Sequence, residues 1–221
     1  MVDSLLQFIA PHYCYGCAKP GTLLCSDCKY DITDEANDAC IVCTLPTSVG
    51  ICPRCHTSYD RAWLVGERDG ALRQLIDELK FRRVRAASQS LSDLLAARLP
   101  VLPTNCVIVP VPTIGSHIRV RGYDQVQLIA KGVGKRRKLP VQSLVIRRHS
   151  AVQLGASKRL RLKQMSTAFA CVSPVDPDMT YLLIDDVVTT NATLRYCAQA
   201  LRDGGATQVW VAALARQPLD K

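Results

Sequence analysis

The sequence predicts an α/β protein with a mostly parallel sheet flanked by helices, preceded by a small cysteine-rich module. Three observations support this fold class. From residue 61 onward, short apolar runs alternate with helical patterns, as in strand–helix–strand units. One such run, residues 181–185, passes into two adjacent acids and a hydroxyl-rich turn before the next helical pattern begins. Ahead of these elements, four Cys-x-x-Cys pairs lie between residues 14 and 55.

The length and charge of the chain limit the possible organisation. The 221 residues suffice for one α/β domain and a small module, and we place the boundary between residues 1–60 and 61–221. Between Arg119 and Lys163 there are 13 Lys or Arg residues and one acid. Such concentrated positive charge favours an anionic partner, namely pyrophosphate, a nucleotide or a nucleic acid. The alternative is a solvated basic surface without a polyanion.

The cysteine content indicates metal binding in the cytoplasm. The first ten residues lack a basic start and their apolar run is short, so a secretion signal is not expected. No apolar window in the sequence approaches the length of a membrane span. We expect only a short amphipathic helix over residues 3–10. Eleven cysteines in a chain without a signal favour metal sites over disulfides.

Eight of these cysteines have the spacing of metal ligands. Two thiolates separated by two residues can hold one ion from a tight turn, and two such turns complete a tetrahedron. We predict two structural zinc sites, formed by Cys14, Cys17, Cys25 and Cys28, and by Cys40, Cys43, Cys52 and Cys55. Crossed pairing, first motif with third and second with fourth, is the alternative. Closed four-cysteine sites leave no open position for catalysis.

The elements after residue 60 follow from periodicity and from their end signals. Apolar residues at helical spacing predict helices over 70–81 and 87–99, the second ending at Pro100. Lys80, at the end of the first helix, is a candidate phosphate clamp. Residues 106–110 form a buried strand that the following prolines end, because proline cannot continue a sheet ladder. Residues 119–125 open a further helix.

The second half of this part contains three more predicted strands and one helix. The strands cover 140–146, 181–185 and 207–214, and the helix covers 193–203. The helix ends at two consecutive glycines, Gly204 and Gly205. Residues 147–169 are basic and weakly patterned, so we expect a mobile flap with a short helix near 156–164. Such a flap could close over a bound pyrophosphate and exclude water.

Residues 181–193 are the strongest candidate for a functional site. In open α/β sheets, ligands bind at the carboxyl ends of strands, and the N–H groups at a helix N-terminus suit a phosphate. Thr189, Thr190 and Thr193 add hydroxyl donors. Two carboxylates beside a phosphate cradle suit a sugar diol or a magnesium ion. The plainer interpretation is a buried strand followed by an acidic helix cap.

These residues resemble the PRPP-binding motif of type I phosphoribosyltransferases: apolar residues, two acids, two variable residues, Thr-Thr-Gly, one variable residue and Thr. Asn191 stands where the family has Gly. Asparagine tolerates a left-handed backbone, so we expect the loop to keep its conformation. Together with Val109–Pro112, Arg119–Gln125 and the double cysteine module, the motif resembles the ComF-type phosphoribosyltransferase-like proteins. Tyr123 and Asp124 replace the family's usual Phe and Asn.

The resemblance implies a type I phosphoribosyltransferase fold for residues 61–221, behind a double zinc ribbon, and a set of binding roles. Asp185 and Asp186 would be the catalytic acids that hold the ribose hydroxyls, with Mg²⁺. The PRPP-binding loop would comprise Val187, Val188, Thr189, Thr190, Asn191, Ala192 and Thr193. Pyrophosphate would be bound by Arg119, Arg121, Lys158 and Arg161.

The implied function is magnesium-dependent phosphoribosyl transfer linked to DNA uptake in natural transformation. Single-stranded DNA and a competence helicase-type protein are the further partners that the resemblance suggests. Two alternatives use the same fold without turnover: a single-stranded DNA-binding protein and a PRPP sensor.

Overall fold

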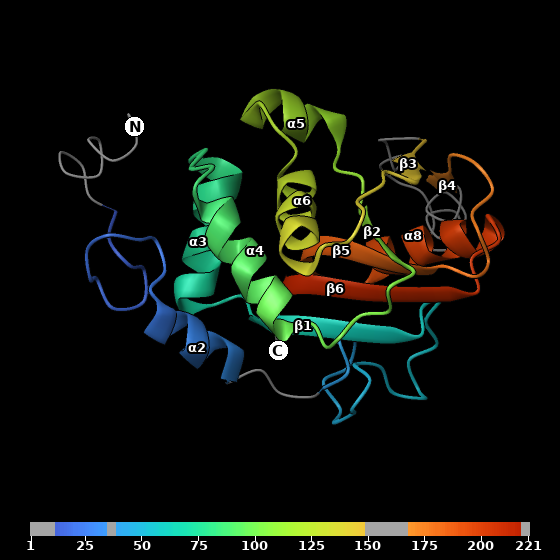
Figure 1. Ribbon diagram of the computed structural model, residues 1–221, viewed down its shortest axis with the longest axis horizontal. Coiled ribbons are helices and arrows are strands. Elements are labelled where there is room, and N and C mark those ends of the chain that lie inside the picture. Colours follow the sequence, from blue (N-terminus) through green and yellow to red (C-terminus); the bar gives the residue numbers. More distant parts are fainter. Residues whose placement is uncertain (1–11, 35–38, 149–167, 218–221) are drawn as a thin grey trace, which may run out of the picture.

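The computed structural model describes residues 12–34, 39–148 and 168–217, and its centre is a parallel sheet (Figure 1). Four strands lie in the order β1–β6–β5–β2, all parallel. Their bounds are β1 Arg61–Glu67, β2 Cys106–Pro110, β5 Thr180–Val188 and β6 Gln208–Arg216. The predicted α/β class, with a mostly parallel sheet, is confirmed.

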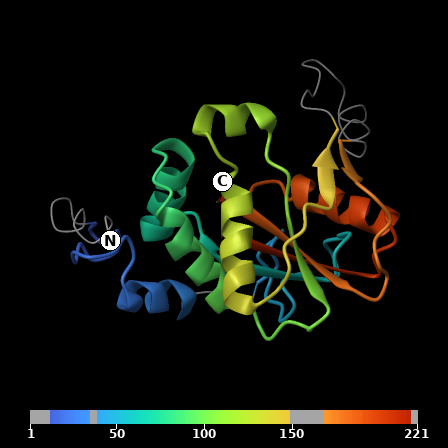
Figure 2. The same cartoon turned by 45° about the horizontal axis from the view of Figure 1, so that its top comes forward.

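Helices cover both faces of the sheet (Figures 1 and 2). Three of them pack on one face: α3 Gly70–Phe81, α4 Ala87–Arg98 and α6 Gln125–Arg137. Helix α8, Ala192–Asp203, connects β5 to β6 and packs against both strands. Because this connection runs back across the sheet, a right-handed crossover places α8 on the other face. Within the described ranges, no helix combines the length and apolar character that a membrane span requires.

Strand β5 lies inside the sheet and extends further than its apolar run predicts. Tyr181 to Ile184 are almost fully buried, as expected for a strand covered on both faces. The strand then continues through both acids, because Val187 and Val188 pair with Ala215 and Arg216 of β6. The two acids are therefore consecutive strand residues, whose side chains point to opposite faces of the sheet.

Some elements differ from the sequence-based expectation. Helices α2, Ser26–Asp34, and α5, Gly115–Arg121, were not predicted, because neither has a buried apolar stripe. The strand expected over 140–146 is shorter and shifted: β3, Val145–Arg147, pairs with β4, Phe169–Cys171, in a separate antiparallel sheet. The helix expected over 3–10 and most of the basic flap, residues 149–167, lie outside the described residues.

The two family departures at residues 123 and 124 fill structural roles at the start of α6. Asp124 is the N-cap of α6, and its side chain accepts a hydrogen bond from the Gln127 N–H at 3.1 Å. The buried Tyr123 donates its phenol hydrogen to the carbonyl oxygen of Leu79 in α3. Asp124 thus caps the first turn of α6, and Tyr123 attaches the start of α6 to α3.

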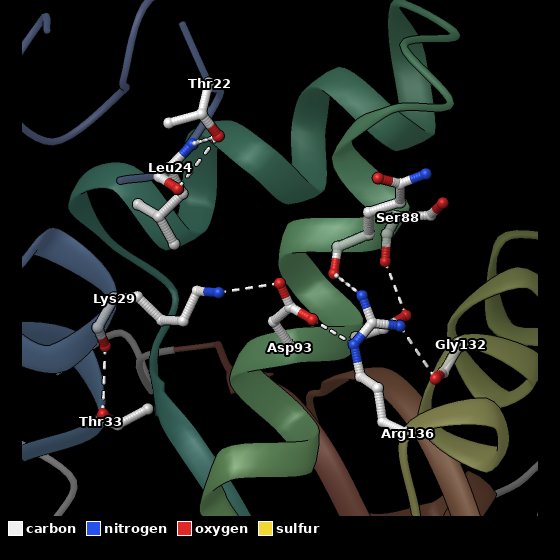
Figure 3. A network of polar contacts seen from close by, with 10 residues as sticks. Thr22, Leu24, Lys29, Thr33, Ser88, Asp93, Gly132 and Arg136 are labelled. Carbon is white, nitrogen blue, oxygen red and sulfur yellow. Dashed lines mark hydrogen bonds and ion pairs between the residues drawn. The ribbon is translucent and has the colours of Figure 1, made fainter. Parts of the chain in front are cut away.

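Both halves of the cysteine module pack on the α/β domain. In the first half, Lys29 of α2 forms an ion pair with Asp93 of α4 at 2.8 Å, and Arg136 of α6 donates to the other carboxylate oxygen (Figure 3). In the second half, the carbonyl oxygen of Val49 accepts a hydrogen bond from the Ala62 N–H at the outer edge of β1. The module is therefore attached both to the helical layer and to the sheet edge.

Candidate functional site

The loop that follows β5 has the left-handed backbone that its motif requires. Asn191 adopts φ 60° and ψ 0°, so the expectation that asparagine would support the loop in place of glycine is confirmed. Thr189 and Thr190 are exposed at the carboxyl end of β5, and Asn191 is 9% exposed. The loop thus presents hydroxyl groups to solvent at the edge of the sheet where ligands bind in this fold class.

The first turn of α8, just after this loop, has N–H groups that Asn191 does not cap. Asparagine at this position normally accepts a hydrogen bond from an N–H two or three residues later. Here the Asn191 side chain makes no such bond, and its Oδ1 accepts from the Tyr59 phenol at 2.9 Å instead. The orphan N–H groups and the positive end of the helix dipole together suit a phosphate dianion.

Asp186 is buried and held by two partners on the α3/α6 face. Lys80 Nζ lies 2.8 Å from its Oδ1, and Gln125 Nε2 donates to its Oδ2 at 2.9 Å. The Gln125 amide is also buried, and its Oε1 has no partner among the described residues. A buried acceptor of this kind is costly unless a donor reaches it, and a sugar hydroxyl could supply that donor.

Asp185 has a different environment on the α8 face. Its Oδ1 accepts a hydrogen bond from the Asp186 N–H at 2.8 Å. Burial, together with the neighbouring Asp186 charge, raises the pKa of Asp185 to about 7. A carboxylate that forms no ion pair among the described residues and ionises near neutrality is suited to a magnesium ion or a hydroxyl donor. That both acids hold the ribose therefore stays a prediction, with Asp185 the more available of the two.

Two of the four predicted pyrophosphate ligands lie in α5, beyond the ends of α3 and α6 (Figures 1 and 2). Arg119 is exposed. Arg121 is half-buried, with its guanidinium carbon 5.8 Å from the centroid of the Phe81 ring, and its Nη1 is buried without a partner among the described residues. The other two, Lys158 and Arg161, lie outside the described residues.

The eight cysteines form two groups whose ligand atoms lie close together. The sulfurs of Cys14, Cys17, Cys25 and Cys28 all lie within 4.8 Å of one another, and so do those of Cys40, Cys43, Cys52 and Cys55. Consecutive motifs are thus combined, not crossed ones. A Cβ atom at Gly16 would lie only 2.6 Å from Cys28 Sγ, so the first turn closes only around glycine.

The chemistry of these groups fits zinc. Burial opposes ionisation of Cys14, but backbone N–H groups donate to its sulfur and lower its pKa to about 6. In the second group, burial again opposes ionisation, and hydrogen bonds to the sulfur lower the pKa of Cys52 to about 7. Each group thus combines a readily ionised thiol with three further sulfurs within 4.8 Å, and four cysteine sulfurs gathered in this way suit a structural zinc site.

Tyr59 is the site residue that sequence reasoning missed. It follows the second cysteine group and contacts the loop 132 residues later in the chain. Nearby, a cavity of about 240 Å³ is lined by His56 and Thr57 of the module and by Thr190 and Arg195. The sequence feature that could have predicted this contact is the position of the tyrosine just after the last Cys-x-x-Cys pair. That position alone is a weak signal for a functional residue.

Comparison with known proteins identifies relatives of similar length. No family model matches the chain. DNA utilization protein YhgH of Salmonella typhi is 31% identical, over 90% of this chain and 96% of its own. Competence protein F of Haemophilus influenzae is 29% identical, over 76% of this chain and 77% of its own. Competence protein ComFC of Bacillus subtilis is 26% identical, over 85% of this chain and 81% of its own.

Among solved structures, a glutamine phosphoribosylpyrophosphate amidotransferase from B. subtilis, complexed with ADP and GMP, is 20% identical with a TM-score of 0.43. The match covers 59% of this chain and 26% of that one.

The relatives at about 30% identity extend over both the cysteine module and the α/β domain. The chain therefore belongs to the ComF family, the family of Competence protein F, ComFC and YhgH.

Proposed function

We propose that this protein binds PRPP together with Mg²⁺ and transfers its phosphoribosyl group to an acceptor. The observation that carries the proposal is the loop between β5 and α8. It combines a left-handed Asn191, exposed threonine hydroxyls and a helix N-terminus that Asn191 leaves uncapped. The 5′-phosphate of PRPP would occupy this loop, bound by the backbone of residues 187–193 and by the hydroxyls of Thr189, Thr190 and Thr193.

The ribose would lie beside the acids that end β5. Asp185, once ionised, would hold a ribose hydroxyl directly or through Mg²⁺, and the buried Gln125 Oε1 would accept from a second hydroxyl. Magnesium, when bound, would neutralise charge on the pyrophosphate. Asp186 would act mainly by fixing Lys80 and Gln125 in place.

The departing pyrophosphate would meet arginine side chains of α5. As the bond between the ribose C1 and the pyrophosphate oxygen breaks, its electron pair leaves with the pyrophosphate and positive charge develops on the sugar. A new bond then forms from the acceptor to C1. Arg121 Nη1, which has no partner among the described residues, and the exposed Arg119 are candidates for binding the leaving group. Catalysis of this type depends on positioning and electrostatics and needs no covalent enzyme intermediate.

Calorimetric titration with PRPP tests the proposal. Binding is expected with Mg²⁺ and should strengthen from about pH 6 to about pH 8, because Asp185 must be ionised to hold magnesium or a hydroxyl. Ribose lacking both phosphates is the matched control and should give no heat. Absence of PRPP binding at every pH would refute the proposal, whereas binding without turnover on a panel of bases would leave the PRPP sensor.

A second candidate function, single-stranded DNA binding, is supported by one surface. We call it the arginine–phenylalanine patch: Phe81, Arg82, Arg83, Arg85, Arg119, Val120 and Arg121. Phe81 is 66% exposed and Val120 is 69% exposed. Arg83 donates to the Val120 carbonyl at 2.7 Å, so the turn after α3 and the end of α5 form one surface. Exposed aromatic rings among arginines bind bases by stacking and phosphates by charge. The relatives, which are competence and DNA utilization proteins, agree with a DNA-related role.

Replacing Phe81 with alanine is expected to weaken binding of a single-stranded oligonucleotide about tenfold, because one stacked base loses its aromatic partner. Affinity of the wild-type protein should also fall steeply as salt rises. Fluorescence anisotropy measures both effects, and Val101→Ala is the control, since Val101 is 94% exposed and lies outside the patch. Equal affinities for the two variants, or affinity independent of salt, would exclude DNA binding at this surface.

A further inference from the structure

The side chain of Asn191 in the phosphate loop is held by the segment that leaves the cysteine module. Tyr59, four residues after Cys55, is 3% exposed, and its phenol donates to Asn191 Oδ1 at 2.9 Å. Burial raises the pKa of Tyr59, so the phenol is protonated and acts as a donor at neutral pH. This hydrogen bond directly links the module to the loop of the α/β domain.

Neighbours on both sides of Tyr59 fix its position along α8. Ser58 Oγ donates to Gln199 Oε1 at 3.0 Å. Asp60 forms an ion pair with Arg202 at 2.5 Å and accepts a hydrogen bond from the Val209 N–H at 2.8 Å. Tyr59 is therefore presented to the loop by a segment that is itself bound to α8 and to β6.

Asparagine at the start of a helix has a strong alternative to the observed arrangement. With an extended backbone, its side chain caps the first turn by accepting from the N–H of the second or third helical residue, here Thr193 or Leu194. A capped first turn has fewer N–H groups to offer a phosphate. The observed Asn191 has a left-handed backbone and caps neither group, and the only side-chain partner described for it is Tyr59.

We infer that Tyr59 is a positioning residue of the phosphate loop: it holds Asn191 in the left-handed backbone and prevents it from capping α8. The N–H groups of the first turn then stay available to the phosphate. This inference rests on the proposed function, since PRPP is the ligand whose phosphate the loop would bind. A family glycine at position 191 would not need such a partner, because glycine adopts the left-handed backbone without strain and has no side chain to cap with.

The test is a double-mutant cycle read by two methods. Tyr59→Phe should weaken PRPP binding with Mg²⁺ about tenfold, the effect of one ordinary hydrogen bond. In an Asn191→Gly background, the same Tyr59→Phe change should have no effect. In the ligand-free protein, Tyr59→Phe should slow amide hydrogen exchange at Thr193 and Leu194, because the released Asn191 side chain now caps them.

The matched control is Tyr181→Phe, which removes another largely buried phenol whose hydrogen bond goes to the Asp176 carbonyl at 2.9 Å, away from the loop. It should change neither measurement. Unchanged PRPP affinity in Tyr59→Phe, an equal loss in the glycine background, or faster exchange at Thr193 and Leu194 would each overturn the inference. If the wild-type protein binds no PRPP, the proposed function fails, and the exchange measurement alone then decides whether Tyr59 positions Asn191.

Discussion

Replacing Asp185 with asparagine should strongly weaken PRPP binding and, at pH 8, make the protein more stable. The carboxylate is the available acid of the site, so its loss should weaken PRPP binding at least about a hundredfold, as expected for removal of a charged ligand contact. Asparagine has the same shape and can still accept the Asp186 N–H. Titration calorimetry measures the affinity and urea unfolding measures the stability.

The stability effect follows from the direction of the pKa shift. The folded-state pKa of Asp185 is raised to about 7 by burial and by the Asp186 charge. Because the folded-state pKa lies above the unfolded-state pKa of about 4, protonated Asp185 contributes fully to the free energy of unfolding below about pH 4. This contribution is lost as pH rises through about 7. The wild-type protein should therefore lose about 4 kcal/mol relative to the variant between pH 4 and pH 8. A variant that binds PRPP normally, or one that is less stable than wild type at pH 8, would refute the role assigned to Asp185.

Replacing the adjacent acid should have the opposite effect on stability. Asp186→Asn leaves the Lys80 ammonium, whose side chain is 15% exposed, without its counter-charge. Removing one partner of a buried pair typically costs about 3 kcal/mol. Asp77→Asn is the control in the same helix as Lys80: its pair with Arg68 is 32% exposed at the acid, so the loss should be below about 1 kcal/mol. If both variants lose the same free energy of unfolding, the buried Lys80–Asp186 pair contributes no more to stability than an exposed pair.

Metal analysis should find two zinc ions in each chain, one for each group of four cysteines. Cys40→Ala should reduce the content to one and unfold the second half of the module, because binding energy in such sites is folding energy, on the order of 10 kcal/mol. Its effect should reach the sheet, since Arg216 of β6 donates to the Cys40 carbonyl at 3.2 Å. PRPP binding should weaken as well, through the loss of an ordered Tyr59.

Two comparison variants make the zinc prediction specific. Cys171→Ser alters a cysteine of β4 that belongs to neither group, and the protein should keep both ions. Cys14→Ala should also lose one ion, but the first half of the module contacts α4 through Lys29 and does not hold the phosphate loop. It should therefore affect PRPP affinity less than Cys40→Ala. Fewer than one zinc in the purified wild-type protein would exclude the double zinc ribbon.

Local patterns in the sequence were sufficient for most of the architecture. Apolar runs and helical spacing located strands β2, β5 and β6 of the sheet and helices α3, α4 and α8 to within a few residues. The cysteine spacing predicted which sulfurs lie together, because each pair is a single turn. The loop motif predicted a helix start after two acids, and the tolerance of asparagine for a left-handed backbone predicted the conformation of residue 191. In each case the relevant residues are close in sequence.

The tertiary structure alone decided how the acids differ and what holds the loop. Lys80 and Asp186 are 106 residues apart, and Tyr59 and Asn191 are 132 apart. No periodicity reports such contacts, because they depend on how helices and the cysteine module pack on the sheet. The extension of β5 through both acids came from pairing with β6, and it is this pairing that turns one carboxylate toward Lys80 and the other toward α8. Short-range patterns specify which residues are present at the site, whereas packing between distant segments specifies which of them remain available to a ligand.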